Sequence, residues 1–248
     1  LGGVVFNASN ILLAAAVALC GMSVAFPVGV GLALVLGVLI NYFGAAKGDP
    51  LFIFLGVALI AAAIVMNGLA YRMARTGKRK LTAKGLLISV AAGTIMAFFY
   101  RFVASSMDLD SFTAPAAGKM TPYTAVVVFA AGVFVSNFLF NTIAMKCPVE
   151  GTPVRPSEYF GGTFRTHLVG MLGGAIWCLG ESFSMIASGK AGAAISYGLG
   201  QGATLVSALW GILIWKEFRG APGASVLCNA GMFVLFLAGL GLLIYAGA

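Results

Sequence analysis

One acidic residue, Glu181, lies well inside an apolar stretch, on a stripe with helical spacing. The rest of the stripe is small or aromatic: Gly170, Gly174, Trp177, Ser184 and Ser188. A carboxylate is costly in lipid, so it marks by default a path for substrate or protons. The Trp177 indole offers a flat surface and one hydrogen-bond donor beside Glu181. We interpret Glu181 as a substrate-facing carboxylate that also binds the coupling proton. The alternative is a structural carboxylate satisfied by a neighbouring helix.

Arg101 is the only basic residue well inside an apolar stretch. Counted from the start of its predicted helix, it lies at a depth similar to that of Glu181. The two residues are therefore candidates for a buried pair, for which substrate or proton would compete. In the alternative interpretation, Arg101 extends to the outer headgroups.

Two segments interrupt the helical pattern, FPVGVG at 26–31 and YGLGQG at 197–202. Paired Gly/Pro interruptions in two halves of a chain are the best sequence indication of a transporter's binding site. We expect Tyr197 and Gln201 to be polar wall residues there. Close helix packing is the competing interpretation for the small residues, which are Pro27, Gly29, Gly31, Gly198, Gly200 and Gly202.

Amide side chains are the remaining polar candidates. Asn137 and Asn141 are one turn apart, so they share a helix face, and they are secondary candidates for binding substrate. Asn10 corresponds to Glu181 in an internal repeat described below, which makes it a candidate for the opposite wall. Amides in membrane helices more often join helices to one another.

The composition defines the class of protein. Of 248 residues, 60% are hydrophobic and only 9% are charged, whereas soluble domains have about a quarter charged residues. We therefore expect an all-α integral membrane protein. The net charge of +8 suggests no nucleic-acid partner, because its largest cluster lies between two apolar stretches. With one histidine and four cysteines that show no CxxC spacing, we predict no metal site, cofactor or disulfide framework.

A spanning helix needs about 20 largely apolar residues. On that rule the sequence predicts eight spans, at 3–22, 24–43, 51–73, 85–106, 123–145, 166–188, 191–215 and 224–246. Membrane strands are excluded, since they are about 10 residues long and alternate polar with apolar.

The lysines and arginines predict the orientation, because they are enriched in cytoplasmic loops. The basic linker 74–84 should be cytoplasmic, together with the links after the spans 123–145 and 191–215. Eleven basic residues then face inward: Arg72, Arg75, Lys78, Arg79, Lys80, Lys84, Lys146, Arg155, Arg165, Lys216 and Arg219. Only three face outward: Lys47, Lys119 and Lys190.

Residues 1–31 and 172–202 form an internal repeat without gaps, offset by 171 positions. Gly2-Gly3 matches Gly173-Gly174, and Phe6 matches Trp177. The copies are five spans apart. Because consecutive spans cross the membrane in opposite directions, spans an odd number apart run in opposite directions, so the copies should lie antiparallel across the membrane. This is the inverted-repeat design of many transporters. By symmetry, two spans should precede Leu1, which gives ten spans as five plus five. We divide the chain into three parts. Residues 1–73 are the remainder of the first repeat, residues 74–84 are a linker, and residues 85–248 are the second repeat.

Two stretches carry a family resemblance: GMSVAFPVGVGLALVLGVLINYF at 21–43 and GKAGAAISYGLGQGATLVSALWGILIWKEFRG at 189–220. Their most specific part is Trp215-Lys216-Glu217-Phe218 before a basic turn. The chain resembles the drug/metabolite transporter (DMT) superfamily, EamA-like in fold, and within it the ureide permease and glucose/ribose porter branch. This resemblance implies uptake or exchange of small polar solutes, often with protons. The P-loop template fails at Gly77-Lys78, which Arg79 follows, so we predict no nucleotide binding.

The leading hypothesis is a secondary transporter of the plasma (inner) membrane that works by alternating access. Its partners would be a small polar solute such as a ureide, nucleobase or sugar, the lipid bilayer, protons, and a second copy in a homodimer. The alternatives are a multidrug or metabolite exporter of the same fold and a non-transporting receptor or structural subunit. An enzyme is disfavoured, because the acids are scattered and there is one histidine. The sequence does not specify the solute.

Overall fold

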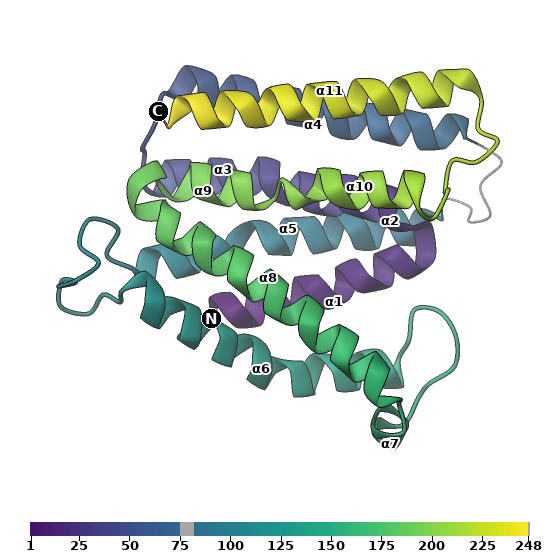
Figure 1. The fold of residues 1–248 in the computed structure, drawn as a ribbon, viewed down its shortest axis with the longest axis horizontal. Coiled ribbons are helices and arrows are strands. Elements are labelled where there is room, and N and C mark those ends of the chain that lie inside the picture. The colour runs from purple at the N-terminus through teal and green to yellow at the C-terminus, as the bar shows by residue number, and fades with distance from the viewer. Residues whose placement is uncertain (75–81, 248) are drawn as a thin grey trace.

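The computed structural model is almost entirely helical and describes residues 1–74 and 82–247 (Figure 1). The helices in chain order are α1 (Gly2–Cys20), α2 (Met22–Ala25), the π-helix η1 (Phe26–Val30), α3 (Gly31–Gly44), α4 (Pro50–Met73), α5 (Ala83–Ser106), α6 (Pro122–Lys146), α7 (Pro156–Phe160), α8 (Phe164–Ala191), α9 (Ala193–Gly200), α10 (Ala203–Leu213) and α11 (Gly223–Ala246). Most of the predicted basic linker, including Gly77, Lys78 and Arg79, lies outside the described residues.

In the part of the chain that the structure describes, seven helical runs are long and apolar enough to cross a membrane, which confirms a multi-pass, all-α membrane protein. The span predicted at 191–215 is interrupted within the glycine-rich segment 197–202, where the sequence predicts an interruption. This segment forms two shorter helices, α9 and α10, which meet at a turn at Gln201 and Gly202. Three glycines in five residues weaken the helix here, since glycine lacks the conformational restriction that favours helix. The first-copy counterpart stays continuous from Met22 to Gly44, although η1 widens its second turn around Pro27.

The helices lie in layers along one long axis (Figure 1). α4 and α11 pack side by side at one edge, and α3 packs against α9 in the next layer. α5 contacts both α1 and α3, and α6 contacts α1 and α8. α1 and α8 run in opposite directions along the axis, as do the α2–α3 run and the α9–α10 run (Figure 1).

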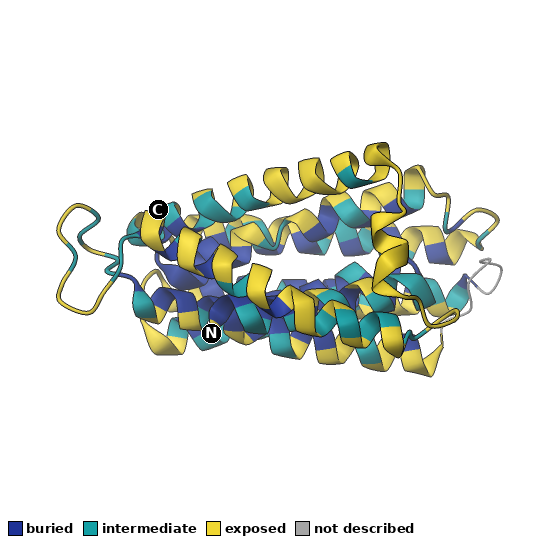
Figure 2. Ribbon diagram, turned by 90° about the horizontal axis from the view of Figure 1, so that it is seen from below, coloured by how far each residue is buried: buried dark blue, intermediate teal, exposed yellow. Residues whose placement is uncertain are grey.

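Several helices approach so closely that their backbones touch at glycines. A Cβ added to Gly93 of α5 would collide with the backbone oxygen of Gly29, and one added to Gly3 of α1 would collide with that of Phe129 on α6. Small residues permit this packing in lipid, where association depends on van der Waals contact rather than on the hydrophobic effect. The buried residues consequently gather between the helices, while outer faces are exposed (Figure 2).

The links between helices are divided between the two ends of the bundle. α4, α6 and α10 all end at the same end, where α5, α8 and α11 begin (Figure 1). The loop after α5 lies at the other end and is held by Asp108, whose carboxylate accepts from the backbone N–H groups of Asp110, Ser111 and Ala116. These donors hold the pKa of Asp108 below its usual value.

We predict that Gly93→Ala destabilises the bundle by about 1–3 kcal/mol, because the new methyl group overpacks the contact with Gly29. The free energy of unfolding in mixed micelles measures this effect. Gly68→Ala is the matched control, since Gly68 is exposed in α4 and an added Cβ meets nothing within 4 Å. Equal stability of the two variants would contradict the proposed role of close backbone approach.

Candidate substrate site around Glu181

The predicted stripe on α8 faces the bundle only in its second half. Ser188 is buried, and Ser184 is partly buried against α5 and α9. Gly170 and Gly174 are exposed, and a Cβ at either would meet nothing within 4 Å. The site is therefore built on the part of α8 that begins at Trp177.

Ser184 joins three helices. The hydroxyl of Tyr100 on α5 donates to the Ser184 carbonyl oxygen at 3.0 Å, and the Ser184 hydroxyl donates to the carbonyl of Ser196 on α9 at 3.2 Å. The Ser196 hydroxyl is itself buried without a hydrogen-bond partner in the described residues. Sequence reasoning missed Ser196, because a serine in a glycine-rich segment carries no distinctive signal.

Glu181 lies one turn before Ser184 on α8. Its Oε1 atom is buried and has no hydrogen-bond partner among the described residues. The phenols of Tyr100 and Tyr197 lie close enough to Glu181 to interact with its charge. Leaving a buried polar atom unpaired is costly, so this oxygen is an acceptor available to a proton or to a bound molecule.

Aromatic rings form a wall next to Glu181. The indole of Trp177 stacks on Phe6 of α1, with ring centroids 4.7 Å apart and an interplanar angle of 21°. Phe6 packs in turn against Phe99 of α5 and Phe129 of α6, at 5.1 and 5.7 Å. Phe6 and Trp177 are 171 positions apart, the offset of the predicted repeat, so residues that match in the sequence touch in the structure. Trp177 keeps 40% of its surface exposed, which leaves part of the indole free for contacts.

Arg101 is not paired with Glu181. Its guanidinium lies against Gly44 at the end of α3, where an added Cβ would collide with it. The physical reason is helical geometry: consecutive residues point about 100° apart, so when Tyr100 points toward α8, Arg101 points toward α3. The placement at a helix end agrees with the alternative in which Arg101 extends toward the membrane surface.

Tyr197 is 1% exposed and does not line an open wall. Its hydroxyl donates to the carbonyl of Ala33 on α3 at 3.0 Å and reaches that of Met96 on α5 at 3.5 Å. Gly37 of α3 makes room for the ring, since an added Cβ there would overlap the phenol. Tyr197 thus joins α9 to the α3–α5 pair and supports the site from behind.

The interrupting glycines lie at helix contacts. An added Cβ would meet Leu243 and Val38 at Gly198, Ser184 at Gly200, and Leu240 at Gly202. In the first copy, Gly29 faces Leu13 and Ser89, Gly31 faces Ile64, and Pro27 is buried in η1. Gln201 is partly buried at the turn between α9 and α10, next to this packing.

The structure does not bring the amides to Glu181. Asn137 and Asn141 share a face, as predicted, and the Asn141 amide donates to Asn137 at 2.9 Å, but both are exposed on α6. Asn10 is exposed on α1, one turn beyond Phe6. Asn7 makes the interhelical bonds instead, donating to Ser136 of α6 at 3.0 Å.

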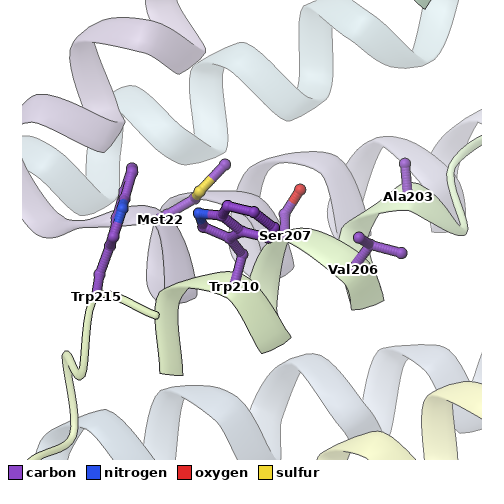
Figure 3. A pocket seen from close by; sticks show the side chains of 6 residues that line it. All are labelled: Met22, Ala203, Val206, Ser207, Trp210 and Trp215. Carbon is purple, nitrogen blue, oxygen red and sulfur yellow. The ribbon is translucent and has the colours of Figure 1, made fainter. Parts of the chain in front are cut away.

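A hollow lies along α10, apart from Glu181 (Figure 3). It has a volume of about 400 Å³ and is lined by Met22, Ala203, Val206, Ser207, Trp210 and Trp215. Figure 3 shows the two indoles and the Met22 side chain at one end of it. Apart from Ser207 the lining side chains are apolar or aromatic, so this hollow offers little to a polar solute.

The aromatic residues beside Arg101 and the carboxylate of Glu217 make further contacts within the bundle. Among the aromatic residues near Arg101, Phe99 and Tyr100 are each 1% exposed and belong to the core, whereas Phe98 and Phe102 are exposed as expected of lipid-facing rings. Glu217, which follows α10, binds the start of α2. No local pattern could have revealed this contact, because its partners are nearly 200 residues away.

Comparison with known proteins places the chain in a family. The ureide permease family model matches residues 72–246. Ureide permease 2 of Arabidopsis thaliana is 24% identical over 168 residues, which are 67% of this chain and 42% of that protein. Ureide permease 1 of the same plant is 24% identical over 165 residues, 66% of this chain and 42% of its own. The chain thus spans less than half the length of these relatives. No solved structure matches it.

The helical bundle and its apolar spans define an integral, multi-pass membrane protein. Within that class the chain belongs to the ureide permease family, since the family model covers well over half of its residues. The resemblance to ureide permeases is confirmed, whereas the drug/metabolite transporter superfamily stays a prediction.

We predict that Tyr197→Phe lowers the free energy of unfolding by about 1 kcal/mol, the typical net value of one hydrogen bond. The ring contacts with Phe99 and Tyr100 would remain, and only the bond to Ala33 would be lost. Tyr245→Phe is the control, because Tyr245 is 64% exposed. If both variants unfold at the same denaturant concentration, Tyr197 does not support the site in the way described.

Proposed function

We propose that this protein is a membrane carrier, not an enzyme, which moves a small polar solute by alternating access. The observation that carries the proposal is the buried, unpartnered Oε1 of Glu181 beside the broken helix α9–α10. An ionisable group in the membrane interior is by default a substrate or proton site. Membership of the permease family supports the same function.

The chemistry around Glu181 favours a neutral solute rich in N–H or O–H donors, such as a ureide, nucleobase or sugar. The carboxylate and the unpartnered Ser196 hydroxyl accept hydrogen bonds from such groups. The partly exposed Trp177 indole offers a flat surface to a planar ring. A proton and the solute would compete for the same carboxylate oxygen, which couples their movements.

We propose that the two repeat copies are inverted, as in the DMT superfamily. Two matching hairpins support this. Gly21 has φ 84° and ψ 166°, and Gly192 has φ 85° and ψ 157°. The N–H of each glycine donates to the residue four positions earlier, Val17 or Ser188, at 2.9 Å. The antiparallel course of α1 and α8 fits the same symmetry.

The symmetry also accounts for an uncovered face on α8. In the first copy, Gly2 and Gly3 pack against α5 and α6. Their equivalents, Gly173 and Gly174, are exposed and meet nothing within 4 Å. We propose that two further helices, equivalent to α5 and α6, cover this face and the hollow along α10, giving ten spans in all.

The division into 1–73 and 85–248 around the linker 74–84 follows from the same proposal. We propose that the linker faces the cytoplasm and that the protein resides in the plasma (inner) membrane. The described links rich in lysine and arginine lie at the linker's end of the bundle, which supports this orientation.

We predict that Glu181→Gln reduces uptake driven by a proton gradient by about tenfold to a hundredfold, since a hydrogen bond to a charged group contributes about 1.5–3 kcal/mol. The measurement is uptake of labelled ureide, nucleobase or sugar into proteoliposomes with and without a pH gradient. Glu150→Gln, which changes an exposed loop residue, should leave uptake unchanged. Full uptake by Glu181→Gln with unaltered pH dependence would exclude the proposed role.

We predict that Gly173→Leu and Gly174→Leu each destabilise the full-length protein by about 1–3 kcal/mol, because the leucine side chain would overpack the contact with the covering helices. The thermal unfolding midpoint in detergent measures this. Gly241→Leu is the control, because Gly241 is also exposed with nothing within 4 Å of an added Cβ. If all three leucines are tolerated equally, the face of α8 is covered by lipid rather than by helices.

A further inference from the structure

The carboxylate of Glu217, which follows α10 in the second repeat, binds the hairpin between α1 and α2 in the first repeat. Glu217 Oε1 accepts from the backbone N–H of Met22 at 3.0 Å, and Oε2 accepts from that of Ser23 at 2.9 Å. The Ser23 hydroxyl also donates to Oε2. These N–H groups are at the start of a helical run, where backbone donors are unpaired and an anion is favoured.

The backbone after α10 folds back to place this carboxylate. Lys216 adopts a left-handed conformation, with φ 54°, and the next N–H, of Glu217, donates to the Gly211 carbonyl at 3.1 Å. Gly21 leaves room for the carboxylate, which lies 3.0 Å from where a Cβ would be. The contact therefore depends on a turn that a lysine adopts only at some energetic cost.

A lysine makes the equivalent contact at the other end. Lys47, in the link after α3, donates from Nζ to the carbonyl of Gly189 in the last turn of α8, at 2.7 Å. Its side chain lies against Gly192, 3.0 Å from where a Cβ would be. A cation is favoured there, since the last carbonyls of a helix are unpaired.

The two contacts are reciprocal. Each charged residue follows the second helical run of one repeat and binds the hairpin glycine region of the other repeat. The α1–α2 and α8–α9 junctions lie at opposite ends of the bundle (Figure 1). The charges are opposite, and each matches the helix end that it meets.

We propose that Glu217 and Lys47 are positioning residues that close the carrier at its two ends, Glu217 at the end rich in lysine and arginine and Lys47 at the other. This inference rests on the proposed function. Alternating access requires contacts between the two halves that break at one end at a time. A hydrogen bond to a charged group shifts a two-state equilibrium by about tenfold to a hundredfold, enough to bias opening while leaving it reversible.

The test measures which end opens. Two buried alanines just beyond the hairpin glycines serve as reporters, Ala25→Cys for the Glu217 end and Ala194→Cys for the Lys47 end. They are introduced in a full-length background whose four native cysteines are replaced. Membrane-impermeant maleimide is applied from each side of proteoliposomes, and uptake of the labelled solutes is measured on the same samples.

We expect Glu217→Gln to speed labelling of Ala25→Cys about tenfold or more and to leave Ala194→Cys unchanged or slower. Lys47→Met should give the reverse pattern. Ser23→Ala, which removes one donor and keeps the charge, should act like Glu217→Gln but more weakly, and it serves if Glu217→Gln does not fold. Glu150→Gln and Lys190→Met, which alter exposed residues, should change neither rate.

Faster labelling of both reporters by each variant, or of neither, while uptake by the unsubstituted protein persists, would show that the two contacts only stabilise the fold and would overturn this assignment alone. If the unsubstituted protein takes up no solute, the proposed function fails, and the closing role fails with it.

Discussion

Direct contact between helix backbones is the constraint on which the rest of the bundle depends. Lipid provides no hydrophobic drive for helices to associate, so α1, α3, α5 and α6 hold together by close packing and interhelical hydrogen bonds. The touching backbones of Gly29 and Gly93, and of Gly3 and Phe129, fix how these helices cross. Larger residues at these points would push apart the core that supports Tyr100 and Tyr197.

Once the crossing is fixed, polar groups find partners across helices rather than within them. Tyr197 reaches α3, Asn67 of α4 donates to Ser23 at 3.1 Å, and Ser225 of α11 donates to Ala70 at 2.7 Å. Each bond removes an unpaired group from a medium without water, where such groups are costly. Glu181 Oε1 and the Ser196 hydroxyl remain without partners around Ser184. Four further buried atoms of the described residues also lack a partner, the Oδ1 atoms of Asn41, Asn67 and Asn229 and the Thr204 hydroxyl. Glu181 differs from all of these because its side chain is ionisable.

The charged groups divide between interior and ends according to what they do. Glu181 lies inside the bundle next to the broken helix, where the proposed carrier would need an acceptor. Glu217 and Lys47 lie at the ends, where they bind backbone groups at the start of α2 and in the last turn of α8. In the proposed carrier, this gives a site in the middle and a closing contact at each end, as alternating access would require.

The sequence by itself determined the features that follow from local composition and spacing. The apolar runs predicted the spans, because a membrane requires about 20 such residues in a helix. The glycine register predicts the repeat, and the lysines and arginines predict which links share one side of the membrane. The stripe from Trp177 to Ser188 was readable as one helix face, since a helix repeats every 3.6 residues.

The tertiary structure alone decided which faces meet. Helical periodicity places Tyr100 and Arg101 about 100° apart but does not say which of them turns toward α8. It likewise pairs Asn137 with Asn141 without indicating that their face is exposed. The contact of Glu217 with Met22 joins residues 195 positions apart in the chain. Such contacts are determined by how whole helices cross, which no local pattern encodes.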